Sequence, residues 1–191
     1  MGLIHRFRQA LRKFQYRFNH PSEQADANAV LLAKLLLEMR SRQSILLSIH
    51  EAEFKVFSQF GEDGIIQYLI GRIPIPERAF VEFGVENYLE SNTRFLLQNN
   101  NWRGLIIDSG AGNIDSIRSH RLSLYHELTS VRALVTAENI NEILTGAGFT
   151  GDIGLLSIDI DGNDYWVWKA IECISPRIVI CEYNSVFGGG H

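Results

Sequence analysis

The chain has 191 residues, of which 46% are hydrophobic and 21% are charged, and its formal net charge is −4. These values are typical of a globular domain with an appendage. No apolar run approaches the roughly 18 residues that a transmembrane helix needs, and basic residues interrupt any signal-peptide core at the start. The two cysteines lack the spacing of a metal site. We therefore expect a cytoplasmic protein without a disulfide framework or a zinc site.

Charge is distributed unevenly along the chain. The first 20 residues carry five basic and no acidic side chains, and the remaining 13 basic and 22 acidic residues leave the rest of the chain at −9. An acidic body argues against nucleic acid as the main partner. The basic charge is concentrated in one short N-terminal segment.

That segment, residues 1–18, predicts a basic amphipathic helix, with apolar residues spaced three or four apart. Such a helix suits the anionic inner face of a membrane, a partner, or the protein's own domain. A polar linker, residues 19–28, and a second helix, residues 29–50, follow. The second helix could pack on the main domain or pair with a second copy in a homo-oligomer. We expect residues 1–50 to form a helical arm and residues 51–191 the main domain.

A polar cluster opens the main domain just before a predicted helix over residues 65–70. It contains four polar side chains: Ser58, Gln59, Glu62 and Asp63. Asp63 or Ser58 could have a role in a site or could only cap the helix.

The stretch from Ala79 to Thr93 predicts a buried strand, a tight turn and the start of a helix near Arg94. Glu82 stands two residues before Gly84, and ligands of α/β sheets bind where such strands end. The loop lacks the second glycine of a dinucleotide fingerprint, and Glu86 adds unfavourable negative charge for a phosphate. A nucleoside cofactor without phosphates, recognised by carboxylates, fits this loop better.

A second buried strand, residues 102–108, ends at Asp108, which lies 24 residues beyond Gly84. An acid roughly 20 residues beyond the glycine loop commonly binds ribose hydroxyls, although a strand can also simply end in an acid. The next strand could be either residues 123–125 or residues 131–135, before a helix over residues 138–146.

Two further strands are predicted over residues 155–161 and 177–183, after a loop at residues 148–154. Between these strands we expect a helix over residues 165–174, stopped by Pro176, with Trp166 and Trp168 in packing positions. The alternation of strands and helices predicts an α/β fold with a Rossmann-like, mostly parallel sheet. The strand ends would then gather acids at one sheet edge, where carboxylates are costly unless something binds them: Glu82, Asp108, Asp159, Asp161 and Glu182.

In order and spacing, these blocks resemble the S-adenosylmethionine-dependent methyltransferases, most closely the FkbM-type branch. The resemblance runs over residues 57–183 and is carried by F-S-Q-F-G-E-D-G, F-V-E-F-G, E-S-N-T, L-I-I-D, L-L-S-I-D-I-D-G-N-D and I-V-I-C-E-Y-N. The family continues into a final antiparallel strand pair. We therefore expect a domain that lacks this pair, with an exposed sheet edge, in a chain that is a fragment or is short by nature.

The resemblance also implies roles for the acids and their neighbours. S-adenosylmethionine would be bound by five residues: Glu82, Gly84, Asn92, Asp108 and Asp159. The catalytic base would be Asp159, Asp161 or Glu182. The residues that close over the cofactor or substrate as a lid would be Ser58, Gln59, Glu62 and Asp63, together with Asn184. The acids and Asn184 could alternatively hold Mg²⁺, although we expect no metal ligands.

The expected activity is O-methylation of a sugar or glycolipid hydroxyl, with the basic N-terminal helix holding the enzyme near a lipid-linked acceptor. Two other readings remain open. One is a non-catalytic Rossmann-like module for binding or assembly. The other is a divalent-metal-dependent hydrolase.

Overall fold

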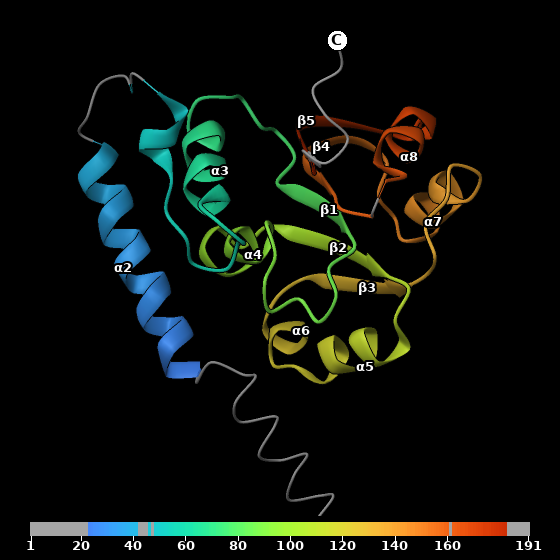
Figure 1. Ribbon diagram of the computed structural model, residues 1–191, viewed down its shortest axis with the longest axis horizontal. Helices are drawn as coiled ribbons and strands as arrows, with labels where there is room; N and C mark the ends of the chain where they lie inside the picture. The colour runs from blue at the N-terminus through green and yellow to red at the C-terminus, as the bar shows by residue number, and fades with distance from the viewer. Residues whose placement is uncertain (1–22, 42–45, 47, 161, 183–191) are drawn as a thin grey trace, which may run out of the picture. The chain divides into compact units, whose positions relative to one another are not determined.

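The computed structural model describes residues 23–41, 46, 48–160 and 162–182 (Figure 1). The predicted amphipathic helix at residues 1–18 lies outside these residues. Two predicted site residues, Asp161 and Asn184, also lie outside them. The chain divides into two compact units, residues 1–46 and 47–191. Within the described part of the chain, no helix is both long and apolar enough to span a bilayer.

The first unit contains helix α2, Glu23–Ser41. The helix predicted over residues 29–50 therefore begins and ends earlier in the chain than expected. Residues 23–28 are helical although they were expected to be linker, because Glu, Gln and Ala favour helices and a polar stretch is not by itself a loop. The predicted end of this helix belongs to the second unit, where Ile49–Ala52 forms the short 3₁₀ helix η1.

The second unit is built on a sheet of five strands, all parallel, in the order β3-β2-β1-β4-β5. This arrangement confirms the predicted Rossmann-like α/β class. The strands are β1 Ala79–Phe83, β2 Arg103–Asp108, β3 Leu128–Arg132, β4 Gly151–Ile158 and β5 Ile174–Cys181. Every residue of β1 is buried, as expected for a central strand covered on both faces.

Helices cover both faces of the sheet (Figure 1). They are α3 Glu62–Ile70, α4 Arg94–Asn100, α5 Ala111–Ser119, α6 Leu122–Tyr125, α7 Ile140–Gly146 and α8 Asp164–Ala170. Side chains of α3, α4 and α5 form one apolar core with Phe80 and Ile106, while those of α7 and α8 form the other core with Val81 and Leu105. Successive residues of a strand point to opposite faces, so Glu82 and Asp108 lie on the face of Phe80 and Ile106.

The third strand was predicted poorly. Of the two candidates, residues 123–125 form α6, and residues 131–135 overlap only the end of β3. The reason is that β3 is a half-buried edge strand of the described sheet and so lacks a continuous apolar run.

The fourth strand begins inside the predicted loop and ends before Asp159. Its Gly154 is a strand residue: a Cβ there would lie 2.4 Å from the Trp102 ring, which packs against the bare backbone. A glycine in this stretch therefore marks close packing and not a turn.

The last helix and the last strand also begin and end at other residues than predicted. α8 ends at Ala170, and Pro176 lies within β5, opposite Ile153. Because β5 is an edge of the described sheet, the missing N–H of a proline is tolerated there. The expectation that Trp166 and Trp168 supply packing was wrong, since they are 60% and 43% exposed.

Candidate functional site

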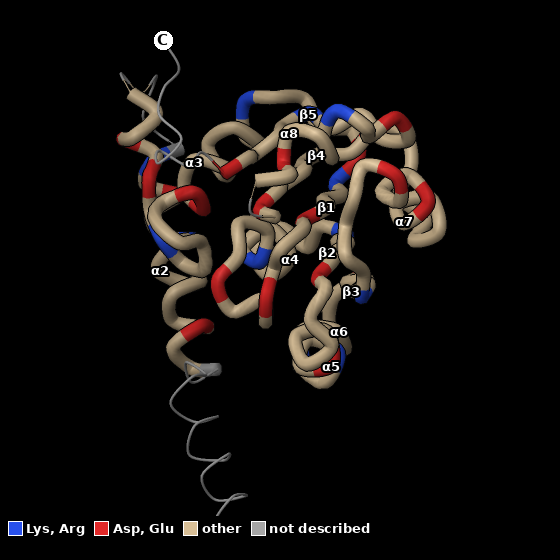
Figure 2. The backbone as a smooth tube through the Cα atoms, turned by 45° about the vertical axis from the view of Figure 1, so that its right-hand side comes forward, with Lys and Arg blue, Asp and Glu red and all other residues tan. Residues whose placement is uncertain are grey.

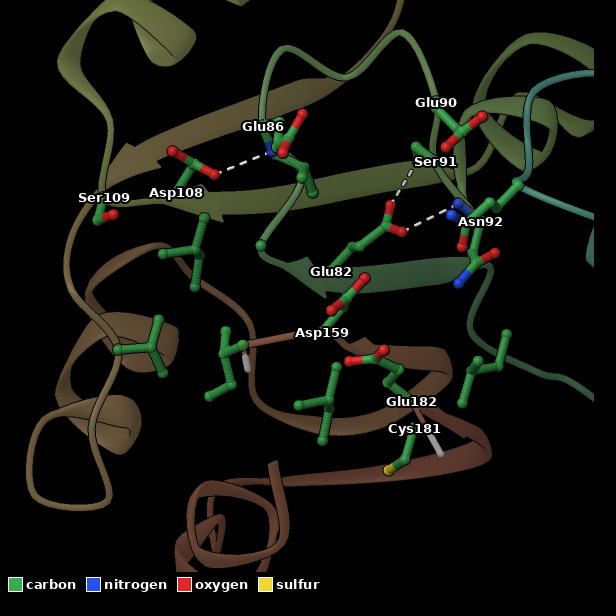
Figure 3. Close-up of a pocket in the computed structure, with 18 of the residues that line it drawn as sticks. Glu82, Glu86, Glu90, Ser91, Asn92, Asp108, Ser109, Asp159, Cys181 and Glu182 are labelled. Carbon is green, nitrogen blue, oxygen red and sulfur yellow. Dashed lines mark hydrogen bonds between the residues drawn. The ribbon is translucent and has the colours of Figure 1, made fainter. Parts of the chain in front are cut away.

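A cavity of about 820 Å³ lies at the carboxyl ends of the strands (Figure 3). Its wall includes residues from the loops that follow β1, β2, β3, β4 and β5. This is the edge at which open parallel sheets bind ligands, and the volume suits a small organic molecule.

The cavity brings together most of the residues singled out in the sequence. Its wall contains eight of them: Gln59, Glu62, Glu82, Gly84, Asn92, Asp108, Asp159 and Glu182. Ser58 and Asp63 do not belong to this wall. Asp161 and Asn184 lie outside the described residues.

Asp63 and Ser58 instead hold the backbone ahead of α3. Asp63 Oδ2 accepts hydrogen bonds from the N–H groups of Val56, Phe57 and Ser58, at 2.7 to 2.8 Å, and from the Ser58 hydroxyl. Ser58 Oγ in turn accepts the Asp63 N–H. Both side chains are buried. The N-cap residue of α3 is Gly61, which makes no side-chain cap hydrogen bond, so the prediction that Asp63 or Ser58 caps this helix was wrong.

Gly84 is the point where the loop after β1 meets the end of β4. Its φ is 72°, and a Cβ at this position would lie 1.6 Å from the Asp159 carbonyl oxygen. Only glycine fits both the left-handed backbone and this contact. Glu86 and Tyr88 also have positive φ angles, 47° and 61°, so the loop between β1 and α4 is conformationally demanding.

Glu82 is 5% exposed and is surrounded by hydrogen-bond donors. Oε2 accepts the hydroxyls of Ser91 at 2.6 Å and Thr93 at 2.5 Å. Oε1 accepts the Asn92 N–H at 3.0 Å and the Ser157 hydroxyl at 3.3 Å. Burial raises the pKa of Glu82, and these hydrogen bonds oppose that rise.

Asp108 anchors the same loop from the neighbouring strand. Oδ2 accepts the Glu86 N–H at 2.9 Å (Figure 3). Oδ1 accepts the Gly110 N–H and the Asn113 side-chain amide N–H. A carboxylate has roughly four acceptor positions, so one position on Oδ2 is not used by these three donors. The acids at these two strand ends are therefore compensated largely by the protein's own donors.

Asp159 and Glu182 differ from Glu82 because both are exposed. They follow Ile158 and Cys181, which are register partners in β4 and β5, so the two acids leave adjacent strand ends. Figure 3 shows both carboxylates on the same side of the cavity. Cys181 also lines the wall, and burial together with the charge of Asp164 raises the pKa of its thiol.

The wall is strongly acidic. Seven carboxylates and no Lys, Arg or His line the cavity in the part of the chain that the structure describes: Glu62, Glu82, Glu86, Glu90, Asp108, Asp159 and Glu182. Figure 2 marks the Asp and Glu positions of the described chain in red along the backbone. Such a wall attracts cations and hydrogen-bond donors, and it repels phosphate.

Sequence reasoning missed several wall residues. Glu90 belongs to the E-S-N-T block but was given no role; its carboxylate pairs with Lys55 at 3.3 Å. The segment after β3, Ala133 to Val135, was missed because that strand was misplaced, and its Leu134 forms an apolar rim that is 73% exposed. Correct placement of β3 would have identified this segment as a strand-end loop.

Within the described residues, no three His, Cys, Asp or Glu side chains are grouped so that they could hold a metal ion. The acids of the cavity thus surround a space without converging on one point.

The chain matches no protein-family model, and no curated protein is significantly similar to it in sequence. The class that the structure establishes is a Rossmann-like parallel α/β sheet. The site must therefore be interpreted from its own chemistry.

Proposed function

We propose that this protein is an S-adenosylmethionine-dependent methyltransferase that methylates a hydroxyl group of a sugar or glycolipid. The acidic wall is the observation that carries the proposal. S-adenosylmethionine has a sulfonium and an ammonium against one carboxylate, so it is a cationic nucleoside without phosphates. Seven carboxylates and no basic side chain among the described wall residues favour such a ligand over a dinucleotide.

Three features of the wall fit the group that would be bound. The unused acceptor position on Asp108 Oδ2 suits a ribose hydroxyl. The apolar Leu134 and Val135 border the same space and suit a flat base. Gly84 brings the loop backbone close to the end of β4 and adds no side chain of its own to the wall.

Bound there, the cofactor would supply a methyl group to the acceptor oxygen and become a neutral thioether. The protein's part is to position the acceptor and to take up its hydroxyl proton. Asp159 and Glu182 are suited to this because both are exposed acids on neighbouring strand ends. Asp161 remains a candidate base from the sequence.

The resemblance to FkbM-type enzymes supports a sugar or glycolipid acceptor. The basic segment at residues 1–18 would bring the enzyme to an anionic membrane that carries such an acceptor. This role of the segment stays a prediction from its sequence.

Titration calorimetry of the full chain with S-adenosylmethionine, S-adenosylhomocysteine and NAD⁺ tests the cofactor. We expect binding of the first two and none of NAD⁺, whose phosphates the acidic wall repels. Absence of heat and of a thermal shift with both adenosyl compounds would contradict the proposal and favour a non-catalytic module.

Charge variants distinguish attraction of the cofactor by the wall carboxylates from the effect of the protein's overall negative charge. Removing two charges with D159N and E182Q together should weaken S-adenosylmethionine more than neutral-sulfur S-adenosylhomocysteine. The control is E142Q, which removes an exposed acid of α7 outside the cavity wall. Equal effects of the double variant and the control would argue against the role of the wall.

A further inference from the structure

The direction of the hydrogen bonds around Glu82 follows from neighbouring backbone N–H groups, which can only donate. Ser91 Oγ accepts the N–H groups of Thr93 at 3.1 Å and Arg94 at 3.3 Å. Because these fill its acceptor positions, the Ser91 hydroxyl must donate to Glu82 Oε2. Two hydroxyl contacts at 2.6 and 2.5 Å are of the short kind that a charged carboxylate makes.

The same reasoning extends from Glu82 to the cavity wall. Ser157, which is 1% exposed, donates its hydroxyl to Glu82 Oε1 at 3.3 Å. Its oxygen is then an acceptor, and it accepts a hydrogen bond from the Asn92 side-chain N–H at 3.2 Å. The nitrogen of the Asn92 amide must therefore face Ser157. Its carbonyl, Oδ1, is then the acceptor atom of the amide that is left for a ligand donor, beside the second N–H of Nδ2.

The position of Asn92 separates it from Asp108. Asn92 is tied to β4 through Ser157, whereas Asp108 ends β2, and β1 lies between these strands. Neighbouring strands are about 4.8 Å apart, so the two residues lie at opposite ends of a span of about 10 Å. A nucleoside that carries an amino-acid tail has hydrogen-bond donors on its ribose hydroxyls and on the amino group of the tail.

We propose that Glu82 and Ser157 are positioning residues that present Asn92 Oδ1 to the amino group of the cofactor's amino-acid portion. This inference rests on the proposed function and deepens it. Glu82 has no acceptor position left for a ligand, because four donors of the protein occupy it. Its contribution to binding is made through Asn92.

The test compares two ligands that differ in the amino-acid portion. S-adenosylhomocysteine carries it, and 5′-methylthioadenosine has the same adenosine and thioether without it. By calorimetry on the full chain, N92A should weaken S-adenosylhomocysteine by about tenfold, the usual effect of one hydrogen bond to a charged group. The affinity for 5′-methylthioadenosine should change less than about twofold.

A second variant, S157A, leaves Asn92 in place and removes the group that orients it. We expect a smaller loss of S-adenosylhomocysteine affinity and again little change for 5′-methylthioadenosine. Equal weakening of both ligands by N92A, or no weakening of either, would overturn the inference. Wild-type protein that binds neither compound would instead refute the proposed function, and the inference with it.

Discussion

Glu82 and Asp108 stand at the ends of neighbouring strands, yet protein donors occupy most of their acceptor positions. From the sequence, gathered carboxylates were expected to need a ligand. At these two residues the protein's own donors meet that need. The loop between β1 and α4 supplies most of the donors to Glu82, while Gly110 and Asn113 supply two of the three donors to Asp108. The exposed Asp159 and Glu182 remain the acids best placed for chemistry on a bound molecule.

At the residue scale, Gly84 should be the least replaceable glycine of the site. G84A places a Cβ 1.6 Å from the Asp159 carbonyl oxygen at a φ of 72°, so we expect a loss of about 3 kcal/mol or more of unfolding free energy. The control is G112A, at the exposed second position of α5, where nothing lies within 4 Å of the added carbon. Because this position lies in the first turn of the helix, that change should stabilise the protein by less than about 1 kcal/mol. Urea denaturation of both variants measures their unfolding free energies, and similar values for G84A and G112A would contradict the prediction.

At the scale of elements, the segment ahead of α3 depends on a single carboxylate. Asp63 gathers the N–H groups of residues 56–58, and it does so while buried. The polar cluster that the sequence marked as a lid is therefore divided: Gln59 and Glu62 face the cavity, while Ser58 and Asp63 shape the backbone that carries them.

D63A should leave these buried donors without partners and cost about 2–4 kcal/mol. D63N keeps one acceptor oxygen of the same shape, so its loss should be smaller. Thermal melts followed by circular dichroism rank the stability of the wild type, D63N and D63A. A D63A variant as stable as the wild type would show that water satisfies the freed N–H groups.

At the scale of the whole molecule, buried carboxylates make global stability depend on pH. Burial raises the pKa of both Glu82 and Asp63 in the folded protein. For an acid with a raised pKa, the folded state binds the proton more tightly than the unfolded state. Its contribution to stability therefore increases as the pH falls through the folded pKa toward the unfolded value.

The wild type should consequently gain stability relative to E82Q as the pH falls from 8 toward about 5. The gain can reach about 1.4 kcal/mol per pH unit between the two pKa values of Glu82. Urea denaturation of both proteins at several pH values measures the difference, and other titrating groups cancel in it. A difference that shrinks on acidification would mean that the pKa of Glu82 is lowered in the folded protein.

The sequence by itself determined the fold class, the central strand and the acids at the strand ends. These follow from local signals: β1 and β2 are continuous apolar runs, and the carboxyl ends of parallel strands share one edge. It could not determine β3, β4 or β5 accurately, because half-buried edges, Gly154 and Pro176 break the apolar pattern that reveals a strand.

Only the tertiary structure decided which acids are already satisfied and which face the cavity. The partners of Glu82 come from a loop and from Ser157, 75 residues further along the chain, so their approach depends on how the strands are ordered in the sheet. Hydrogen-bond direction likewise depends on every neighbour at once, and no local pattern encodes it. For this reason the candidate ligand atom, Asn92 Oδ1, emerged from the folded arrangement.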